Sequence, residues 1–118
     1  MLAVNPYLNF AGNAEEAFNF YKSVFGGEFL ALQRFKDVPD TGNITEAERD
    51  MIMHVSLPIG KQTILMASDV LESMGHKLAV GNNFYLSLEV ESKEEADRLF
   101  NALSVGGTIE MPLQDMFW

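Results

Sequence analysis

Short segments in which apolar and polar residues alternate recur along the chain, and this period of two predicts β-strands. In the first half the pattern covers residues 6–10, 28–35, 51–57 and 62–67. In the second half it covers residues 84–90 and 107–111. Each predicted strand has two faces of different character, so the sequence predicts a sheet with one face packed against something apolar.

Two amphipathic helices are predicted between polar caps and glycine pairs. Asn13 with Glu16, and Ser92 with Glu95, have the spacing of a capping box, in which a side chain accepts an unpaired backbone N–H at the helix start. Apolar residues follow at helical spacing in each case, and a diglycine ends each helix, at Gly26 and Gly106. We therefore expect helices from residue 14 to the first diglycine and over 93–104.

The order of these elements is repeated. The segment beginning at Asn13 resembles the segment beginning at Ser92, and each follows an alternating strand and precedes a diglycine. This predicts one domain over 1–118, built from a first module at 1–69, a connecting segment at 70–83 and a second module at 84–118. We expect the second module to be incomplete, because two closing strands of the first have no counterpart. The segment 37–50 is rich in acidic residues, and its composition is consistent with either a solvated loop or a lid over a pocket.

Strand parity places polar side chains together on one side of the predicted sheet. Asn5, Tyr7 and Asn9 alternate with apolar residues. Tyr85, Ser87 and Glu89 repeat the arrangement, and the strand at 51–57 puts Ile52, His54 and Ser56 on one side and Met53, Val55 and Leu57 on the other. Such a polar face either meets water or lines a concave cavity.

Composition narrows the classes of function. A chain of 118 residues has the length of one ordinary domain. The absence of cysteine excludes disulfides, thiolate zinc sites and a cysteine nucleophile. The 17 acidic residues against 8 basic ones disfavour nucleic acid and anionic membranes as partners. No segment has the ~20 apolar residues of a membrane span. We expect a cytoplasmic protein, with no phosphate-binding loop, nucleophile elbow or dinucleotide fingerprint.

The sequence resembles the PhnB-like branch of the vicinal oxygen chelate superfamily. The resemblance rests on the segment from Ala14 to Gly26, Met53-His54 entering a strand, and the segments 64–69 and 114–118. That superfamily includes glyoxalase I, bleomycin-resistance proteins and extradiol dioxygenases, and PhnB-like members are often named demethylubiquinone methyltransferase-like. The resemblance implies an α+β fold of paired βαβββ modules, here incomplete at the C-terminus, which form a cleft and commonly a homodimer.

The same resemblance implies where a metal would bind. Ligands of the metal-dependent members fall, by position, near Asn5, on Leu65 or Met66, and near Tyr85, with a fourth beyond Trp118. None of these is His, Glu or Asp, and an amide with a phenol is a poor set for a divalent ion. We therefore expect no metal site and no cofactor.

His54 is the foremost candidate for chemistry, because an imidazole titrates near neutrality and serves as a general base or ligand. Glu89 is the second catalytic candidate, whereas His76 is expected on the surface. The predicted ligand-binding residues are Asn5, Tyr7, Asn9, His54, Ser56, Tyr85, Ser87, Glu89 and Trp118. Together they suggest a protein that binds a small organic molecule in a cleft without a metal. The alternative is a metal-dependent lyase, isomerase or dioxygenase that uses His54 with Glu89.

Overall fold

The computed structural model describes residues 1–39 and 42–114. The chain divides into two compact units, Met1–Gly81 and Asn82–Trp118. The first unit contains a four-stranded sheet in the order β1-β4-β3-β2. Its strands are β1 (Tyr7–Phe10), β2 (Ala31–Arg34), β3 (Ile52–Ile59) and β4 (Thr63–Asp69). The predicted α+β class and the strand-helix-strand-strand-strand order of the first module are confirmed.

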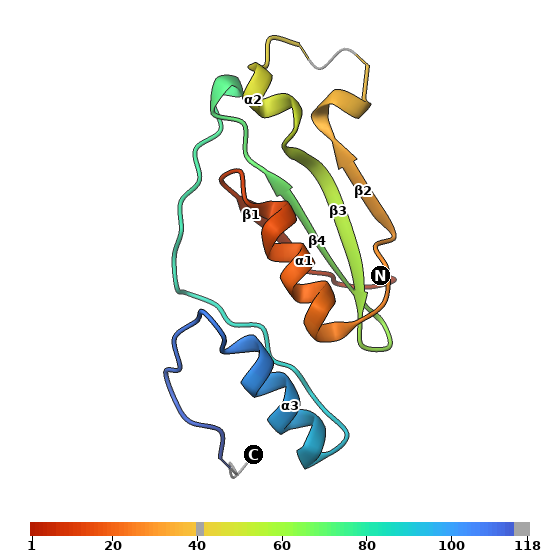
Figure 1. The fold of residues 1–118 in the computed structure, drawn as a ribbon, viewed down its shortest axis with the longest axis vertical. Helices are drawn as coiled ribbons and strands as arrows, with labels where there is room; N and C mark the ends of the chain where they lie inside the picture. Colours follow the sequence, from red (N-terminus) through yellow and green to blue (C-terminus); the bar gives the residue numbers. More distant parts are fainter. Residues whose placement is uncertain (40–41, 115–118) are drawn as a thin grey trace. The chain divides into compact units, whose positions relative to one another are not determined.

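The sheet is mixed, because β1 lies parallel to β4 whereas β4, β3 and β2 are antiparallel neighbours. Helix α1 (Ala14–Phe25) connects β1 to β2 and lies across one face of the sheet (Figure 1). Phe18 of the helix is completely buried against Val55, Leu57 and Ala67 of the central strands. The core therefore lies between α1 and one face of the sheet, as the helical spacing of its apolar residues predicted.

A β-bulge at Met53 corrects the predicted parity of β3. Gln33 pairs with His54 and Arg34 with Ile52, so Met53 is the extra residue between them. Ile52 is consequently buried in the core with 1% of its surface exposed, instead of sharing a face with His54. Alternation along the sequence assumes a regular strand, and one unpaired residue reverses it.

The N-terminus of α1 is capped by a residue distant in the sequence. The Asn13 side chain makes no capping bond, contrary to the prediction. Asp69, at the end of β4, accepts hydrogen bonds from the backbone N–H groups of Gly12 and Ala14, both at 3.0 Å. Its second oxygen accepts from the Ile52 N–H at 2.8 Å. One buried carboxylate thus satisfies donors on the turn before α1 and at the start of β3.

The segment 37–50 contains a short helix that the sequence analysis did not predict. A single 3₁₀ turn, η1 (Phe35–Asp37), follows β2, and α2 (Glu46–Arg49) precedes β3. Thr45 caps α2 in a capping box with Glu48. The spacing of Thr45 and Glu48 was the available signal for this helix. A second 3₁₀ turn, η2 (Glu72–Met74), follows β4.

The second unit contains the predicted helix but, in its described part, none of the predicted strands. Helix α3 (Lys93–Leu103) begins at Ser92, whose hydroxyl accepts from the Glu95 N–H at 3.1 Å, so this cap is confirmed. Residues 84–90 and 107–111 form no β-ladder, which corrects the expectation of strands there. Alternation shows which side chains each face of an extended segment would carry. A β-strand also needs a neighbouring strand whose backbone pairs with it along its length.

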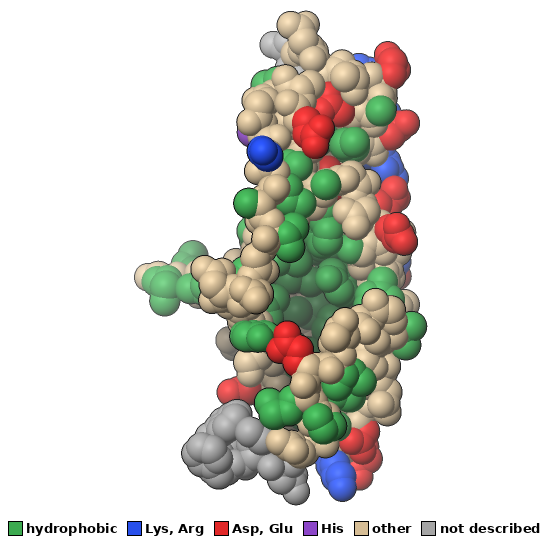
Figure 2. Space-filling view, turned by 90° about the vertical axis from the view of Figure 1, so that its left-hand side faces the viewer, with side chains coloured by type: hydrophobic (Ala, Val, Ile, Leu, Met, Phe, Trp, Pro, Cys, Tyr) green, Lys and Arg blue, Asp and Glu red, His purple; other side chains and the backbone are tan. Residues whose placement is uncertain are grey.

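Acidic residues dominate the charge of the chain, 17 against 8 basic ones. On the face drawn in Figure 2, red acidic side chains are accordingly more prominent than blue basic ones. Among residues 1–39 and 42–114, no helix is long and apolar enough to cross a membrane.

Candidate functional site

The face of the sheet opposite α1, called the open face below, carries four of the polar side chains that parity placed together: Tyr7, Asn9, His54 and Ser56. Strand register aligns Asn9 with Ser68 on β1 and β4, and Tyr7 with Met66. On the neighbouring strands His54 pairs with Gln33, and Ser56 with Met66. The predicted polar side of the first module is therefore a continuous surface across four strands.

Tyr7, His54 and Ser68 form a hydrogen-bonded chain on the open face. The Tyr7 hydroxyl lies 3.1 Å from His54 Nδ1 and 2.5 Å from Ser68 Oγ. Ser68 Oγ in turn donates to the Met53 carbonyl at 2.7 Å. The carbonyl of the bulge residue is thus satisfied by a side chain of the neighbouring strand. Three strands contribute to this chain, which holds the His54 ring against Tyr7 with ring centroids 5.7 Å apart.

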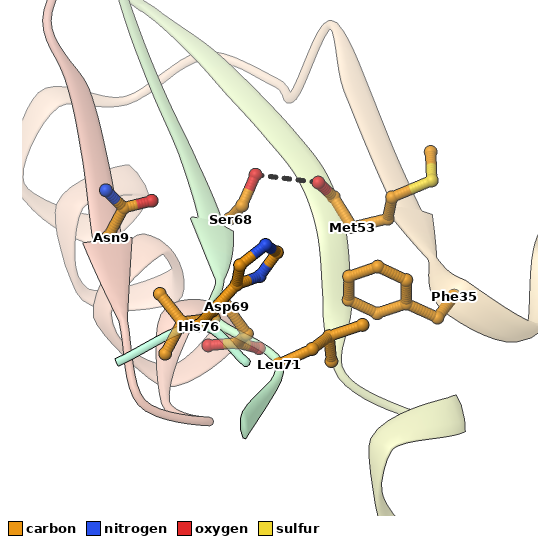
Figure 3. Close-up of a pocket in the computed structure, with 8 residues that line it drawn as sticks. Asn9, Phe35, Met53, Ser68, Asp69, Leu71 and His76 are labelled. Atoms are coloured by element: carbon orange, nitrogen blue, oxygen red, sulfur yellow. Dashed lines mark hydrogen bonds between the residues drawn. The ribbon is translucent and has the colours of Figure 1, made fainter. Parts of the chain in front are cut away.

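A pocket of about 320 Å³ lies at one end of the open face. Figure 3 shows residues of β1, β3 and β4 around it, together with the segment that follows β4. It is lined by Asn9, Phe35, Met53, Ser68, Asp69, Val70, Leu71 and His76. This volume is at the lower end of the range for small-molecule sites.

The pocket has apolar walls and a few polar groups. Phe35, Met53 and Leu71 supply apolar surface, whereas Asn9 and Ser68 supply an amide and a hydroxyl (Figure 3). His76 also lines the pocket, although it is exposed as the sequence analysis expected. Its place in the pocket was not predictable from the sequence, because it depends on η2 folding back beside β4. Its backbone N–H bonds to the Leu71 carbonyl at 3.1 Å, which fixes that return.

Glu48 anchors the segment that closes this end of the pocket. Its carboxylate accepts from the Ser73 hydroxyl at 2.5 Å and from the Ser73 N–H at 3.3 Å. The Ser73 hydroxyl and the Thr45 backbone, both donating to the charged form, hold the pKa of Glu48 below its usual value. The buried glutamate thereby ties α2 to η2, which precedes His76.

Other predicted site residues have structural partners or lie elsewhere. Asn5 Oδ1 accepts from the Ile64 N–H at 2.9 Å, and this bond extends the pairing of β1 with β4. Ser56 is buried, with 5% of its surface exposed. Tyr85, Ser87 and Glu89 belong to the second unit and are exposed there. Trp118 lies outside the described residues.

Tyr85 has one specific partner in the second unit. Its hydroxyl donates to Glu110 Oε2 at 2.9 Å, and this bond to a carboxylate raises the pKa of Tyr85 above its usual value. The interaction links the two segments that were predicted as strands. It is an exposed contact.

The positions that the superfamily would use for a metal do not suit a divalent ion. Asn5 is engaged with the backbone of β4, Leu65 is buried in the core, and Met66 offers only a thioether. Within residues 1–39 and 42–114, no three His, Asp or Glu side chains are grouped so that they would hold a metal. The donor set of the described residues therefore does not fit the superfamily's metal.

The start of α1 is not a free anion site. The N–H groups of Gly12 and Ala14 point at Asp69, whose carboxylate already occupies the place that a ligand phosphate would take. A nucleotide or adenosyl cofactor held at this turn would have to displace a buried carboxylate. This geometry argues against the turn as a cofactor loop.

Comparison with known proteins gives a consistent family. Residues 3–118 match the family described as 3-demethylubiquinone-9 3-methyltransferase. The protein YjdN of Escherichia coli K12 is 30% identical over 126 residues, which cover 99% of this chain and 82% of that protein. The crystal structure of PA1353 from Pseudomonas aeruginosa has a TM-score of 0.85 and 41% identity, covering 100% of this chain and 84% of that one.

A structure from Bacillus cereus, titled as a putative 3-demethylubiquinone-9 3-methyltransferase and PhnB protein, is 28% identical with a TM-score of 0.59. It is matched over 92% of this chain and 78% of that one. The resemblance noted in the sequence is thus confirmed over almost the whole chain. The chain belongs to the PhnB-like, 3-demethylubiquinone-9 3-methyltransferase-like family of the vicinal oxygen chelate superfamily.

Proposed function

We propose that this protein binds a small organic molecule on the open face, without a resident metal, and that the pocket beside Ser68 holds part of that molecule. The observation that carries the proposal is the pocket's construction: apolar side chains from Phe35, Met53 and Leu71 surround the polar groups of Asn9 and Ser68. Apolar walls with a few fixed polar groups are typical of small-molecule sites.

Methyl transfer, the activity in the family's description, has little support in this chain. The turn before α1 contains one glycine, Gly12, and its N–H is bonded to Asp69. Titration with S-adenosylmethionine should therefore give no heat of binding. Saturable binding of that cofactor would contradict the proposal and favour a methyltransferase.

The binding proposal can be tested with a fragment library and two matched variants. Small aromatic fragments should shift the backbone NMR signals of residues around the pocket, Asn9, Ser68 and His76 among them. Val70→Phe places a bulky ring at the pocket wall and should abolish these shifts. Val80→Phe adds the same ring at a position that is 88% exposed and outside the pocket, and should leave them unchanged. Shifts that cluster elsewhere, or survive in Val70→Phe, would reject the pocket.

The metal-dependent alternative is tested separately. Calorimetric titration with zinc, nickel, iron(II) and manganese should show no stoichiometric binding. Tight binding of one ion that is lost in His54→Ala would favour a lyase, isomerase or dioxygenase with His54 as a ligand, and Glu89→Gln would then test the second candidate. His54 and Glu89 keep the roles of catalytic candidates only under that outcome.

We also propose a homodimer, as the family resemblance implies. The second unit exposes large apolar side chains in its first predicted strand, including Phe84 at 65% and Leu86 at 49%. A second copy of the chain would remove such surface from water. Sedimentation velocity should give twice the 13.2 kDa mass at micromolar concentrations. A monomer at all concentrations would contradict this assembly.

A further inference from the structure

The hydrogen-bonded chain on the open face has only one consistent direction. The Met53 carbonyl can only accept, so the Ser68 hydroxyl must use its single proton there. Tyr7 must then donate its own proton to Ser68 Oγ. With that proton committed, the Tyr7 oxygen can only accept from His54, so Nδ1 of the neutral imidazole must carry the hydrogen.

From this we infer that Tyr7 and Ser68 fix neutral His54 as the Nδ1–H tautomer and leave the Nε2 lone pair as a hydrogen-bond acceptor that selects ligands carrying an N–H or O–H donor. The selection of ligands rests on the proposed function, whereas the tautomer does not. Tyr7 and Ser68 act here as positioning residues. His54 lies on the open face outside the pocket lining, so it accepts from the part of the ligand that extends from the pocket along that face.

The surroundings of His54 support an acceptor role. The ring is half-buried and lies on the open face. Its bond to Tyr7 uses Nδ1, and no hydrogen bond from the described residues reaches Nε2. Ser68 belongs both to the hydrogen-bonded chain and to the pocket wall. A molecule in the pocket therefore lies next to the Ser68 hydroxyl, which sets the tautomer of His54. An acceptor left without a donor is costly once a ligand excludes water, and this cost discriminates between ligands.

Charge and lining define the class of ligand further. The net charge of −9 disfavours anions, and the apolar lining of Phe35, Met53 and Leu71 favours a hydrocarbon or aromatic body. The expected ligand is therefore an uncharged or cationic organic molecule that combines an apolar body with a hydroxyl or amine donor.

Imidazole ¹⁵N chemical shifts of the ligand-free protein test the tautomer directly. In the wild-type protein, at a pH at which the His54 imidazole is neutral, the Nδ1–H form should exceed the Nε2–H form, because only the Nδ1–H form completes the hydrogen-bonded chain. Ser68→Ala leaves Tyr7 free to donate to Nδ1, which reverses the bond and should make Nε2–H the major form. Tyr7→Phe removes the acceptor and should also reduce the Nδ1–H form.

Two control variants separate this effect from general damage. Tyr21→Phe and Ser23→Ala make the same chemical changes on α1, away from the hydrogen bonds of Tyr7, His54 and Ser68. They should leave the His54 signals unchanged. His54 found mainly as Nε2–H in the wild-type protein would overturn the inference. A tautomer ratio unaffected by both Ser68→Ala and Tyr7→Phe would overturn the positioning role of those residues.

Phenol and anisole test the selection of donors, because they share a ring and only phenol carries an O–H group. Phenol should bind roughly threefold to tenfold more tightly and shift the His54 Nε2 signal, and His54→Ala should remove the preference. Equal affinities for phenol and anisole, or no change of the His54 Nε2 signal with either probe, would overturn the inference that the ligand carries a hydrogen-bond donor. The tautomer result, obtained without ligand, shows whether the inference or only the proposed function has failed.

Discussion

Asp69 joins three parts of the first unit through one side chain. It is 4% exposed, and its two oxygens accept from Gly12, Ala14 and Ile52. A buried carboxylate is tolerated when hydrogen-bond donors surround it, and here the donors are otherwise unpaired backbone groups. The position of Asp69 beside the pocket is thus a consequence of its role in holding α1 and β3.

Asp69→Ala should lower the free energy of unfolding by about 3 kcal/mol, because it leaves buried backbone donors without acceptors. Asp69→Asn keeps one oxygen as an acceptor but places an amide NH₂ group opposite the Ile52 N–H. A smaller loss of unfolding free energy, roughly 1 to 2 kcal/mol, is therefore expected. Urea unfolding measures both. Asp97→Asn, on the exposed side of α3, is the control and should change little. Equal stability of Asp69→Ala and the control would show that Asp69 does not cap α1.

Gly12 is a second residue whose conformation matters to the start of α1. Its φ of +99° is in the left-handed region, and an added Cβ would lie 3.4 Å from Met51 Cε. Gly12→Ala should therefore destabilise the protein by about 1 kcal/mol or more. Gly81→Ala is the matched control, because Gly81 has no positive φ and a Cβ added there would meet no atom within 4 Å. Unchanged stability of Gly12→Ala by thermal unfolding would contradict this reasoning.

At the level of elements, Glu48 connects α2 to η2 and so supports the wall of the pocket. The Thr45 backbone N–H and the Ser73 hydroxyl both donate to Oε1 of its carboxylate. The consequence is a structural link between the segment before β3 and the segment after β4. Neither partner of this link is a predicted site residue, yet both determine where His76 lies.

This link should depend on pH. The pKa of Glu48 is lower in the folded protein than in the unfolded chain, so its stabilisation is fully present above the unfolded value and is lost as the pH falls through the folded value. Glu15, whose pKa is lowered by Arg34, loses its contribution in the same direction. Glu48→Gln should therefore unfold at a lower temperature than wild type at pH 7, and the difference should shrink in acid below about pH 4.

Melting curves from pH 7 to pH 3 provide the measurement. Glu46→Gln, on the exposed side of the same helix, is the control and should follow the wild-type curve. A constant difference between Glu48→Gln and wild type over that range would show that ionisation of Glu48 does not stabilise the fold.

On the scale of the whole molecule, the hydrophobic core belongs almost entirely to the first unit. Phe18, Val55 and Leu57 are fully buried there, whereas Leu99 is the one buried apolar residue of the described part of the second unit. Stability of a domain follows the apolar surface it removes from water. The two units therefore contribute unequally.

Residues 1–81 expressed alone should therefore unfold cooperatively and keep the dispersed NMR spectrum of a folded protein. Residues 82–118 alone should show little stable structure beyond transient helix at α3, since an isolated helix of 11 residues is marginal in water. Circular dichroism and NMR of the two fragments check this. A disordered fragment 1–81 would show that the first unit depends on the second.

Much of the fold was determined by local sequence signals. The spacing of Phe18 and its neighbours defined α1, Ser92 defined the start of α3, and alternation found each strand of the first unit. These features depend on residues close together in the chain, where periodicity and capping chemistry act directly.

The candidate site was only partly predictable for the same reason. Parity placed Tyr7, His54 and Asn9 on the polar side correctly, because side chains in a regular strand alternate. The bulge at Met53, the cap from Asp69 and the position of His76 depend on contacts between segments distant in sequence. The sequence by itself therefore determined which side chains face the same way only where a strand is regular, as for Tyr7 and Asn9, and not across the bulge at Met53. Tertiary structure alone decided which of them meet, because hydrogen bonds such as that from Tyr7 to Ser68 form only after the strands pair.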